Sequence, residues 1–128
     1  MKTTSESAKI LVVDDDPDAR GILSVYLKKK KYLLEEAEDG EKALEKIQSF
    51  NPDVILLDIM MPNLTGDELV KIIKLRTPNI KVIMVTAVGD QGIKAECIKN
   101  GAFACLDKPV NLKNLFSTIR KALEQSIN

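Results

Sequence analysis

Short apolar runs alternate with amphipathic stretches along most of this chain. Continuous four-residue apolar runs occupy 10–13, 54–57 and 82–85. Runs of this kind are typical of strands buried on both faces, as in a parallel sheet. Two further strands are expected near 32–37 and 103–106.

Five amphipathic helices are expected, one after each strand. The first has Asp16 as its N-cap and Pro17 in its first turn, both favourable there. The fourth is expected around 90–100, with Gly101 as its C-terminal stop. The apolar positions predicted to face the core are, in chain order, Ile22, Leu23, Tyr26, Leu27, Ala43, Leu44, Ile47, Leu69, Val70, Ile73, Ile93, Cys97, Ile98, Leu112, Leu115, Phe116, Ile119 and Leu123.

Strict alternation of strands and helices with short connections predicts an α/β fold with right-handed crossovers. We expect a single doubly wound, five-stranded parallel sheet of order 2-1-3-4-5, a flavodoxin-like architecture. The domain is expected to cover residues 9–126, after a flexible N-terminal tail at 1–8.

Composition restricts the function more than the fold. Nineteen basic residues balance nineteen acidic ones, which gives no overall attraction to nucleic acid or to an anionic membrane. No apolar run approaches the ~18 residues of a membrane span, and no signal peptide is evident, so a cytoplasmic protein is expected. Cys97 and Cys105 are expected to be reduced, partly buried residues.

The chain contains no histidine. This excludes serine–histidine and cysteine–histidine catalysis and histidine–metal sites. It also means that this chain cannot itself be a phosphohistidine donor. Any histidine in its mechanism must come from a partner.

Carboxylates follow two of the predicted strands. Asp14 and Asp15 come directly after the first strand, and Asp58 comes directly after the third. In the order 2-1-3-4-5 these strands are neighbours, so the acids should meet at the carboxyl edge of the sheet. They would repel one another without a cation, and Mg²⁺ is the most plausible one because it prefers oxygen ligands.

The last two strands end at residues suited to phosphoryl chemistry. Thr86 offers a hydroxyl donor and Lys108 a positive charge for phosphoryl oxygens. Asp58, isolated in its own loop, could act as a nucleophile toward phosphorus and form an acyl phosphate. Phosphoryl transfer requires little beyond such positioning and charge neutralisation.

With these residues in place, the chain resembles the receiver domain of two-component response regulators, the chemotaxis-regulator-like family. The resemblance covers roughly residues 8–126, and its motifs occur in the family's order and spacing. The matching segments are Val12-Val13-Asp14-Asp15, Asp58-Ile59-Met60-Met61-Pro62 with Gly66 following, Val85-Thr86-Ala87, and Gly101-Ala102 leading to Lys108-Pro109.

The resemblance implies that Asp58 accepts a phosphoryl group from a phosphohistidine of a sensor histidine kinase or a histidine phosphotransfer protein. It implies that Mg²⁺ is held by Asp15, Asp58 and the backbone carbonyl of Met60, with Asp14 acting mainly through water. The domain would take part in its own phosphorylation and dephosphorylation without being an enzyme. It would then switch binding to an unknown downstream protein, as a monomer or a phosphorylation-linked dimer, without binding nucleic acid directly.

The resemblance also assigns the phosphoryl-sensing residues. Thr86 and Lys108 would contact the phosphoryl group, and Ala87 would leave room for access to it. A cis peptide bond is expected between Lys108 and Pro109.

One position departs from the family pattern. Three residues before the lysine, receivers of this type usually carry an aromatic side chain or histidine as a rotamer switch, and here that position is Cys105. The phosphorylation chemistry is unaffected, but the usual aromatic relay is missing. Phe103 could face the same side, although packing in the core or at the sheet edge is the favoured interpretation.

Other functions fit these residues less well. A haloacid-dehalogenase-like phosphatase would use Asp14 and Asp16 on the first strand, but Asp16 precedes Pro17 and is better explained as an N-cap. A flavin-binding module would require a phosphate loop where three aspartates stand. A degenerate receiver used only for docking would be expected to have lost some of the five pocket residues, all of which are intact.

Overall fold

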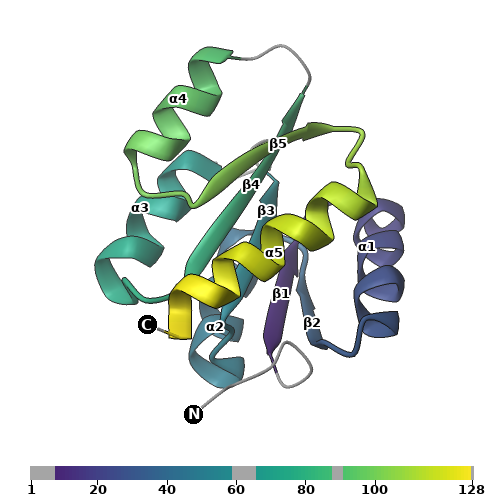
Figure 1. Cartoon of the computed structure of the whole chain (residues 1–128). Helices are drawn as coiled ribbons and strands as arrows, with labels where there is room; N and C mark the ends of the chain where they lie inside the picture. The colour runs from purple at the N-terminus through teal and green to yellow at the C-terminus, as the bar shows by residue number, and fades with distance from the viewer. Residues whose placement is uncertain (1–7, 59–65, 88–90, 128) are drawn as a thin grey trace.

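Strands and helices alternate along the chain as predicted (Figure 1). The computed structural model describes residues 8–58, 66–87 and 91–127. The elements are β1 (Lys9–Val13), α1 (Pro17–Lys29), β2 (Leu33–Ala37), α2 (Gly40–Phe50), β3 (Val54–Asp58), α3 (Gly66–Arg76), β4 (Lys81–Ala87), α4 (Gln91–Lys99), β5 (Ala104–Lys108) and α5 (Leu112–Ile127). None of the described helices is long and apolar enough to cross a membrane.

The five strands form one parallel sheet in the order β2-β1-β3-β4-β5, which confirms the predicted topology. β1 and β3 are adjacent, with Val13 opposite Leu57 in the register. The residues that follow these two positions therefore leave the same edge of the sheet. This adjacency brings acids from two distant segments of the chain together.

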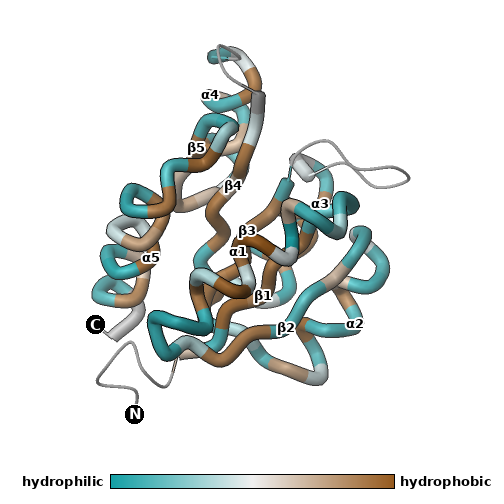
Figure 2. Tube along the Cα trace, turned by 90° about the vertical axis from the view of Figure 1, so that its right-hand side faces the viewer, coloured by the Kyte–Doolittle hydropathy of each residue, from teal (hydrophilic) through white to brown (hydrophobic). Residues whose placement is uncertain are grey.

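Each face of the sheet carries its own hydrophobic cluster. Helices α1 and α5 cover one face, and α2, α3 and α4 cover the other (Figure 1). Figure 2 shows the hydrophobic colouring concentrated in the sheet and the hydrophilic colouring on the outer turns of the helices. Full burial of one leucine or isoleucine contributes roughly 1.5–3 kcal/mol, so these two clusters are the main source of stability.

Local capping residues set the ends of several helices. The side chain of Asp16 accepts a hydrogen bond from the Asp18 amide at 3.0 Å, so its predicted role as the N-cap of α1 is confirmed. Gly101, the predicted stop after α4, has a φ of +113°. A Cβ there would lie 2.8 Å from Cγ of Lys74, so this turn requires glycine on both conformational and steric grounds.

Two predicted core positions were wrong. Ile22 in α1 is 62% exposed and Ile98 in α4 is 48% exposed. Ile22 precedes Leu23, and Ile98 follows Cys97. In each pair the neighbouring residue is the one that is buried in the core. Successive residues on a helix are about 100° apart, so Ile22 and Ile98 point away from the direction that Leu23 and Cys97 face.

The strands extend further toward the functional residues than the apolar runs indicated. β3 includes Asp58, and β4 continues through Thr86 to Ala87. β5 begins at Ala104 rather than 103 and includes Lys108. Backbone pairing decides these limits, because Asp58 lies opposite Val85 and Ala87 lies opposite Lys108. These residues are therefore held by the sheet rather than by loops.

Candidate functional site

Three carboxylates converge where β1 and β3 end. Asp14, Asp15 and Asp58 each offer an oxygen atom, and these atoms lie within 4.8 Å of one another. Asp14 is 5% and Asp58 4% exposed, whereas Asp15 is exposed. The sheet order thus produces the acidic cluster that the sequence predicted.

Burial gives this cluster an electrostatic cost. The pKa of Asp14 is raised above its ordinary value, first by removal of the carboxyl from water and then by the negative charges of Asp58 and Asp15. A hydrogen bond from the Asp16 amide and the charge of Lys108 oppose the shift. The charged form of Asp14 is therefore disfavoured here and would be stabilised by a nearby cation.

Lys108 reaches the cluster from the end of β5. Its Nζ lies 3.1 Å from Oδ2 of Asp58, while its side chain remains 42% exposed. The lysine thus contacts a buried carboxylate from the solvent side. The positive charge of the Lys108 ammonium group in this position can attract a phosphoryl group that approaches Asp58. The peptide bond between Lys108 and Pro109 is cis, as expected.

Thr86 comes from β4, between the acidic cluster and β5. It is 2% exposed and follows Val85, which lies opposite Asp58 in the register. Thr86 itself lies opposite Asp107 on β5. Among the described residues, only four polar or charged ones are buried, and three of them are Asp14, Asp58 and Thr86.

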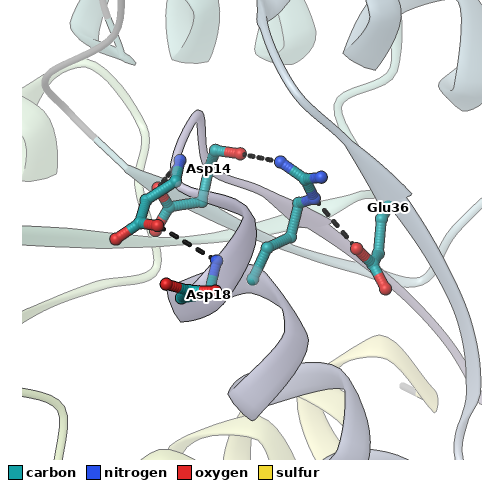
Figure 3. Close-up of polar contacts among 5 residues, drawn as sticks. Asp14, Asp18 and Glu36 are labelled. Carbon is teal, nitrogen blue, oxygen red and sulfur yellow. Dashed lines mark hydrogen bonds and ion pairs between the residues drawn. The ribbon is translucent and has the colours of Figure 1, made fainter.

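The backbone beside the acids is fixed by residues outside the predicted site (Figure 3). The amide of Asp16 donates to Oδ1 of Asp14 at 2.9 Å, and Nη1 of Arg20 donates to the backbone carbonyl of Asp14 at 2.8 Å. Nε of Arg20 also donates to Oε1 of Glu36 at 2.9 Å. Sequence reasoning did not identify Arg20 or Glu36. Nothing in their local pattern distinguishes them from other charged residues, because their contact joins a helix to a strand sixteen residues away.

A cavity of about 620 Å³ opens beside the acids, between the N-terminal half of α1 and the start of α5. Asp14, Asp58 and Lys108 lie at its polar end, and the rest of its wall is mainly aliphatic. Ile22, which was wrongly predicted to be in the core, lines this cavity instead. Access to Asp58 is thus bordered by apolar side chains.

The edge strand β5 carries the position that departs from the family pattern. Cys105 is half-buried and packs against the cluster beneath α2, α3 and α4. Phe103 packs against the opposite cluster, beside α5, with Nζ of Lys81 5.8 Å from its ring centroid. The possibility that Phe103 faces the same side as Cys105 was therefore wrong, while its interpretation as a packing residue agrees with this contact. Asp107 also forms an ion pair of 2.5 Å with Lys94 of α4.

The donor set fits a hard divalent cation. Asp14, Asp15 and Asp58 present only oxygen ligands, which Mg²⁺ prefers. A cation here would also stabilise the charged form of Asp14, whose pKa is raised first by burial and then by the neighbouring carboxylates. The backbone carbonyl of Met60, the remaining predicted ligand, lies outside the described residues, as does the side chain of Ala87.

Sequence comparison relates the whole domain to known proteins. Residues 10–120 match the family described as response regulator receiver domain. The chain is 35% identical over 115 residues to the chemotaxis protein CheY of Listeria monocytogenes, covering 89% of this chain and 97% of that protein. It is 41% identical over 118 residues to a cyclic di-GMP phosphodiesterase of Thermotoga maritima, covering 92% of this chain and 32% of that protein.

Coverage differs among the relatives. The chain spans between 26% and 52% of the length of three curated relatives that it matches. The likeness to these longer proteins is therefore a likeness to one part of each.

Structural comparison gives the same result. A response regulator receiver domain protein from Clostridium thermocellum superimposes with a TM-score of 0.88 at 31% identity, covering 92% of this chain and 95% of that one. The predicted flavodoxin-like receiver fold is confirmed. This protein belongs to the response regulator receiver domain family of two-component signalling.

Proposed function

We propose that this domain, residues 9–126 after a tail at 1–8, accepts a phosphoryl group onto Asp58. The donor is a phosphohistidine of a sensor histidine kinase or a histidine phosphotransfer protein. The P–N bond of the donor breaks as a P–O bond to a carboxylate oxygen of Asp58 forms, and the electron pair returns to the partner's imidazole. The observation that carries this proposal is the 3.1 Å contact between Nζ of Lys108 and the buried carboxylate of Asp58.

The proposal assigns the acidic cluster to Mg²⁺. Asp15, Asp58 and the Met60 carbonyl would hold the cation, with Asp14 mainly through water. Bound there, the cation would neutralise charge on the nucleophile and on the incoming phosphoryl group. The support from this chain is the spacing of its three carboxylates and the raised pKa of Asp14.

Thr86 and Lys108 have distinct roles in the proposed reaction. Lys108 attracts the phosphoryl oxygens and then pairs with the phosphorylated Asp58. Thr86 offers its hydroxyl to one of those oxygens. Its burial supports this role, because a hydroxyl removed from water gains from a charged acceptor.

The partner must bring a histidine to a carboxylate that is 4% exposed. Apolar residues on α1 border this approach: Ile22 is 62% and Val25 57% exposed. Ile22 lines the cavity beside Asp58 and, with Val25, a neighbouring groove along α1. Large exposed apolar residues grouped in this way are typical of protein contact surfaces, which supports binding of the donor protein along α1.

A small-molecule phosphatase is the main alternative, and one observation weighs against it. That chemistry would use Asp16 as acid and base, but the Asp16 side chain caps α1 by accepting from the Asp18 amide. We therefore propose that the domain is a phosphoacceptor rather than an enzyme with turnover. Steady release of phosphate from a small ester would contradict this assignment.

Mass spectrometry of the intact protein tests the proposal. Incubation with acetyl phosphate or a phosphohistidine donor should add one phosphoryl group to the wild type, and only when Mg²⁺ is present. Asp58→Asn should abolish the adduct, because an amide is not a nucleophile toward phosphorus. Asp53→Asn, an acid on another part of the chain, is the matched control and should label like the wild type. Undiminished labelling of Asp58→Asn would refute the assignment.

A further inference from the structure

We propose that Arg20 is a positioning residue of the cation site, held in place by Glu36. Its guanidinium bridges two acceptors, with Nη1 2.8 Å from the Asp14 carbonyl oxygen and Nε 2.9 Å from Oε1 of Glu36 (Figure 3). The inference rests on the proposed function, because the ligands that it positions are those assigned to Mg²⁺. It assigns a role to a helix residue and a strand residue that are not themselves ligands.

The Arg20 bridge between Glu36 and the Asp14 carbonyl lies just beyond the end of β1. β1 ends at Val13, so Asp14 lies beyond the last regular pair of that strand. Its amide still donates to the Ala37 carbonyl at 3.2 Å, and its carbonyl accepts from Arg20. Because Glu36 and Ala37 both belong to β2, both sides of the Asp14 backbone are tied to the same strand. The bridge therefore sets the direction of the peptide that leads into Asp15.

Arginine suits this role better than lysine. The two acceptors lie in different directions, and a planar guanidinium reaches both through separate N–H groups. The Arg20 side chain is 18% exposed, so water competes weakly for the contact. The Asp14 acceptor is also enclosed, since Asp14 is 5% exposed, whereas the Glu36 side chain is 39% exposed. A carbonyl left without a partner in this enclosed place would be destabilising.

A simple charge effect makes the opposite prediction. If Arg20 mattered only as a positive charge near three carboxylates, its removal should strengthen cation binding. If Arg20 positions the backbone, its removal should weaken cation binding although a competing charge is lost. The sign of the change in Mg²⁺ affinity for Arg20→Gln therefore separates the two explanations.

The chain contains a matched control on the same strand. Glu35, next to Glu36, pairs with Lys46 of α2 at 2.6 Å. This ion pair also joins a helix to β2, but it makes no contact with the acidic cluster. Lys46→Gln removes the same charge and the same kind of helix–strand tie. Any loss that reflects only weaker attachment of β2 should appear in both variants.

Direct titration with Mg²⁺ by calorimetry tests the inference. Arg20→Gln should weaken binding by about tenfold, the lower end of the range for residues that orient metal ligands. Arg20→Lys should weaken it nearly as much despite the retained charge, Glu36→Gln somewhat less, and Lys46→Gln not at all. Circular dichroism verifies folding of each variant, and Arg20→Lys remains informative if Arg20→Gln is unstable.

A second readout needs no cation. The amide of Asp16 donates to Oδ1 of Asp14, so its hydrogen exchange reports the order of this segment. Exchange should be faster in Arg20→Gln than in the wild type or in Lys46→Gln. Unchanged or tighter Mg²⁺ binding by Arg20→Gln, or an equal loss in Lys46→Gln, would overturn this inference alone. A wild type that binds no Mg²⁺ would overturn the proposed function and this role together.

Discussion

The two halves of the candidate site are built differently. The acidic half comes from β1 and β3 at the centre of the sheet, where all five residues of β3 are buried. The half that is proposed to sense the phosphoryl group comes from β4 and from the edge strand β5, and none of the five residues of β5 is fully buried. Asp58 is thus held in a strand that is packed on both faces, and Asp14 directly follows one, while Cys105 and Lys108 lie where a side chain has room to move.

In the proposed function, this difference separates the residues that would bind the cation from those that would respond to phosphorylation. Converging carboxylates must be held close together despite their repulsion, which requires a rigid support. A residue that responds to phosphorylation must instead have two accessible positions. We therefore expect substitutions in the central half to change the affinity for Mg²⁺ or the pKa of the acids. Substitutions at the edge should instead change the structural response to phosphorylation.

The largest contrast is expected for Mg²⁺ binding. Asp15→Ala removes a proposed ligand and should weaken the affinity for Mg²⁺ by at least about tenfold. Loss of a residue that only orients a metal ligand already weakens metal affinity by about this factor. Lys108→Ala removes a competing positive charge and should leave affinity equal or higher. Lys108→Ala should instead impair the response to phosphorylation. Calorimetric titration of both variants with Mg²⁺ tests this prediction. Weaker Mg²⁺ binding by Lys108→Ala would contradict the proposed separation of the two halves of the site.

The next effect concerns Asp14 and pH. The pKa of Asp14 is raised on folding, so its charged form destabilises the folded state at a pH above the folded pKa. This penalty begins to decrease as the pH falls through the folded pKa, and it is gone below the ordinary pKa of the unfolded chain. Asp14→Asn keeps the acceptor for the Asp16 amide and should raise Tm by a few degrees at pH 7 without Mg²⁺. That corresponds to about 1 kcal/mol for a domain of this size.

Thermal unfolding of Asp14→Asn across pH gives the measurement. Its advantage over the wild type should shrink toward acid pH, and it should also shrink when Mg²⁺ is added. Asp18→Asn, which lies in the exposed first turn of α1, is the control. A pH-independent gain would show that charge on Asp14 is not its cause.

A smaller effect is expected at the edge. Lys94→Gln breaks the ion pair with Asp107, which joins α4 to the residue before Lys108. The side chains of Lys94 and Asp107 are 20% and 43% exposed. For an ion pair this accessible to water, we expect a loss of about 0.2–1 kcal/mol in the free energy of unfolding. Mg²⁺ affinity should stay unchanged. Denaturant unfolding with a parallel Mg²⁺ titration tests both points, and a weakened cation site would contradict the separation of the two halves.

The smallest effect is expected at Cys105. Phosphate on Asp58 adds about −1.5 to −2 charges, and a thiol cannot fill the space that an aromatic switch would fill. We expect a modest shift of α4 or of its preceding loop and an altered rate of thiol labelling at Cys105, because labelling reports local opening. The comparison uses a Cys97→Ser background, with and without beryllofluoride and Mg²⁺. Identical rates with beryllofluoride bound would show that Cys105 does not respond.

Much of this architecture could be predicted because local patterns and chain order determine it. Continuous apolar runs identify buried strands, and alternation with helices leads to one sheet order. That order brings Asp14 and Asp58 to the same edge, which confirms their predicted proximity. The predicted N-cap at Asp16 and the stop at Gly101 also hold, since each depends on residues within a single turn.

The sequence by itself therefore determined the fold, the strand order and the convergence of the acids, because these follow from periodicity and connectivity. Only the tertiary structure decided that Ile22 lines a cavity, that Phe103 and Cys105 pack on opposite clusters, and that Arg20 joins Glu36 to the Asp14 carbonyl. The physical reason is that these contacts join residues that are far apart in the sequence. Contacts between side chains from different elements depend on how helices rotate and pack against the sheet, and no local pattern records that rotation.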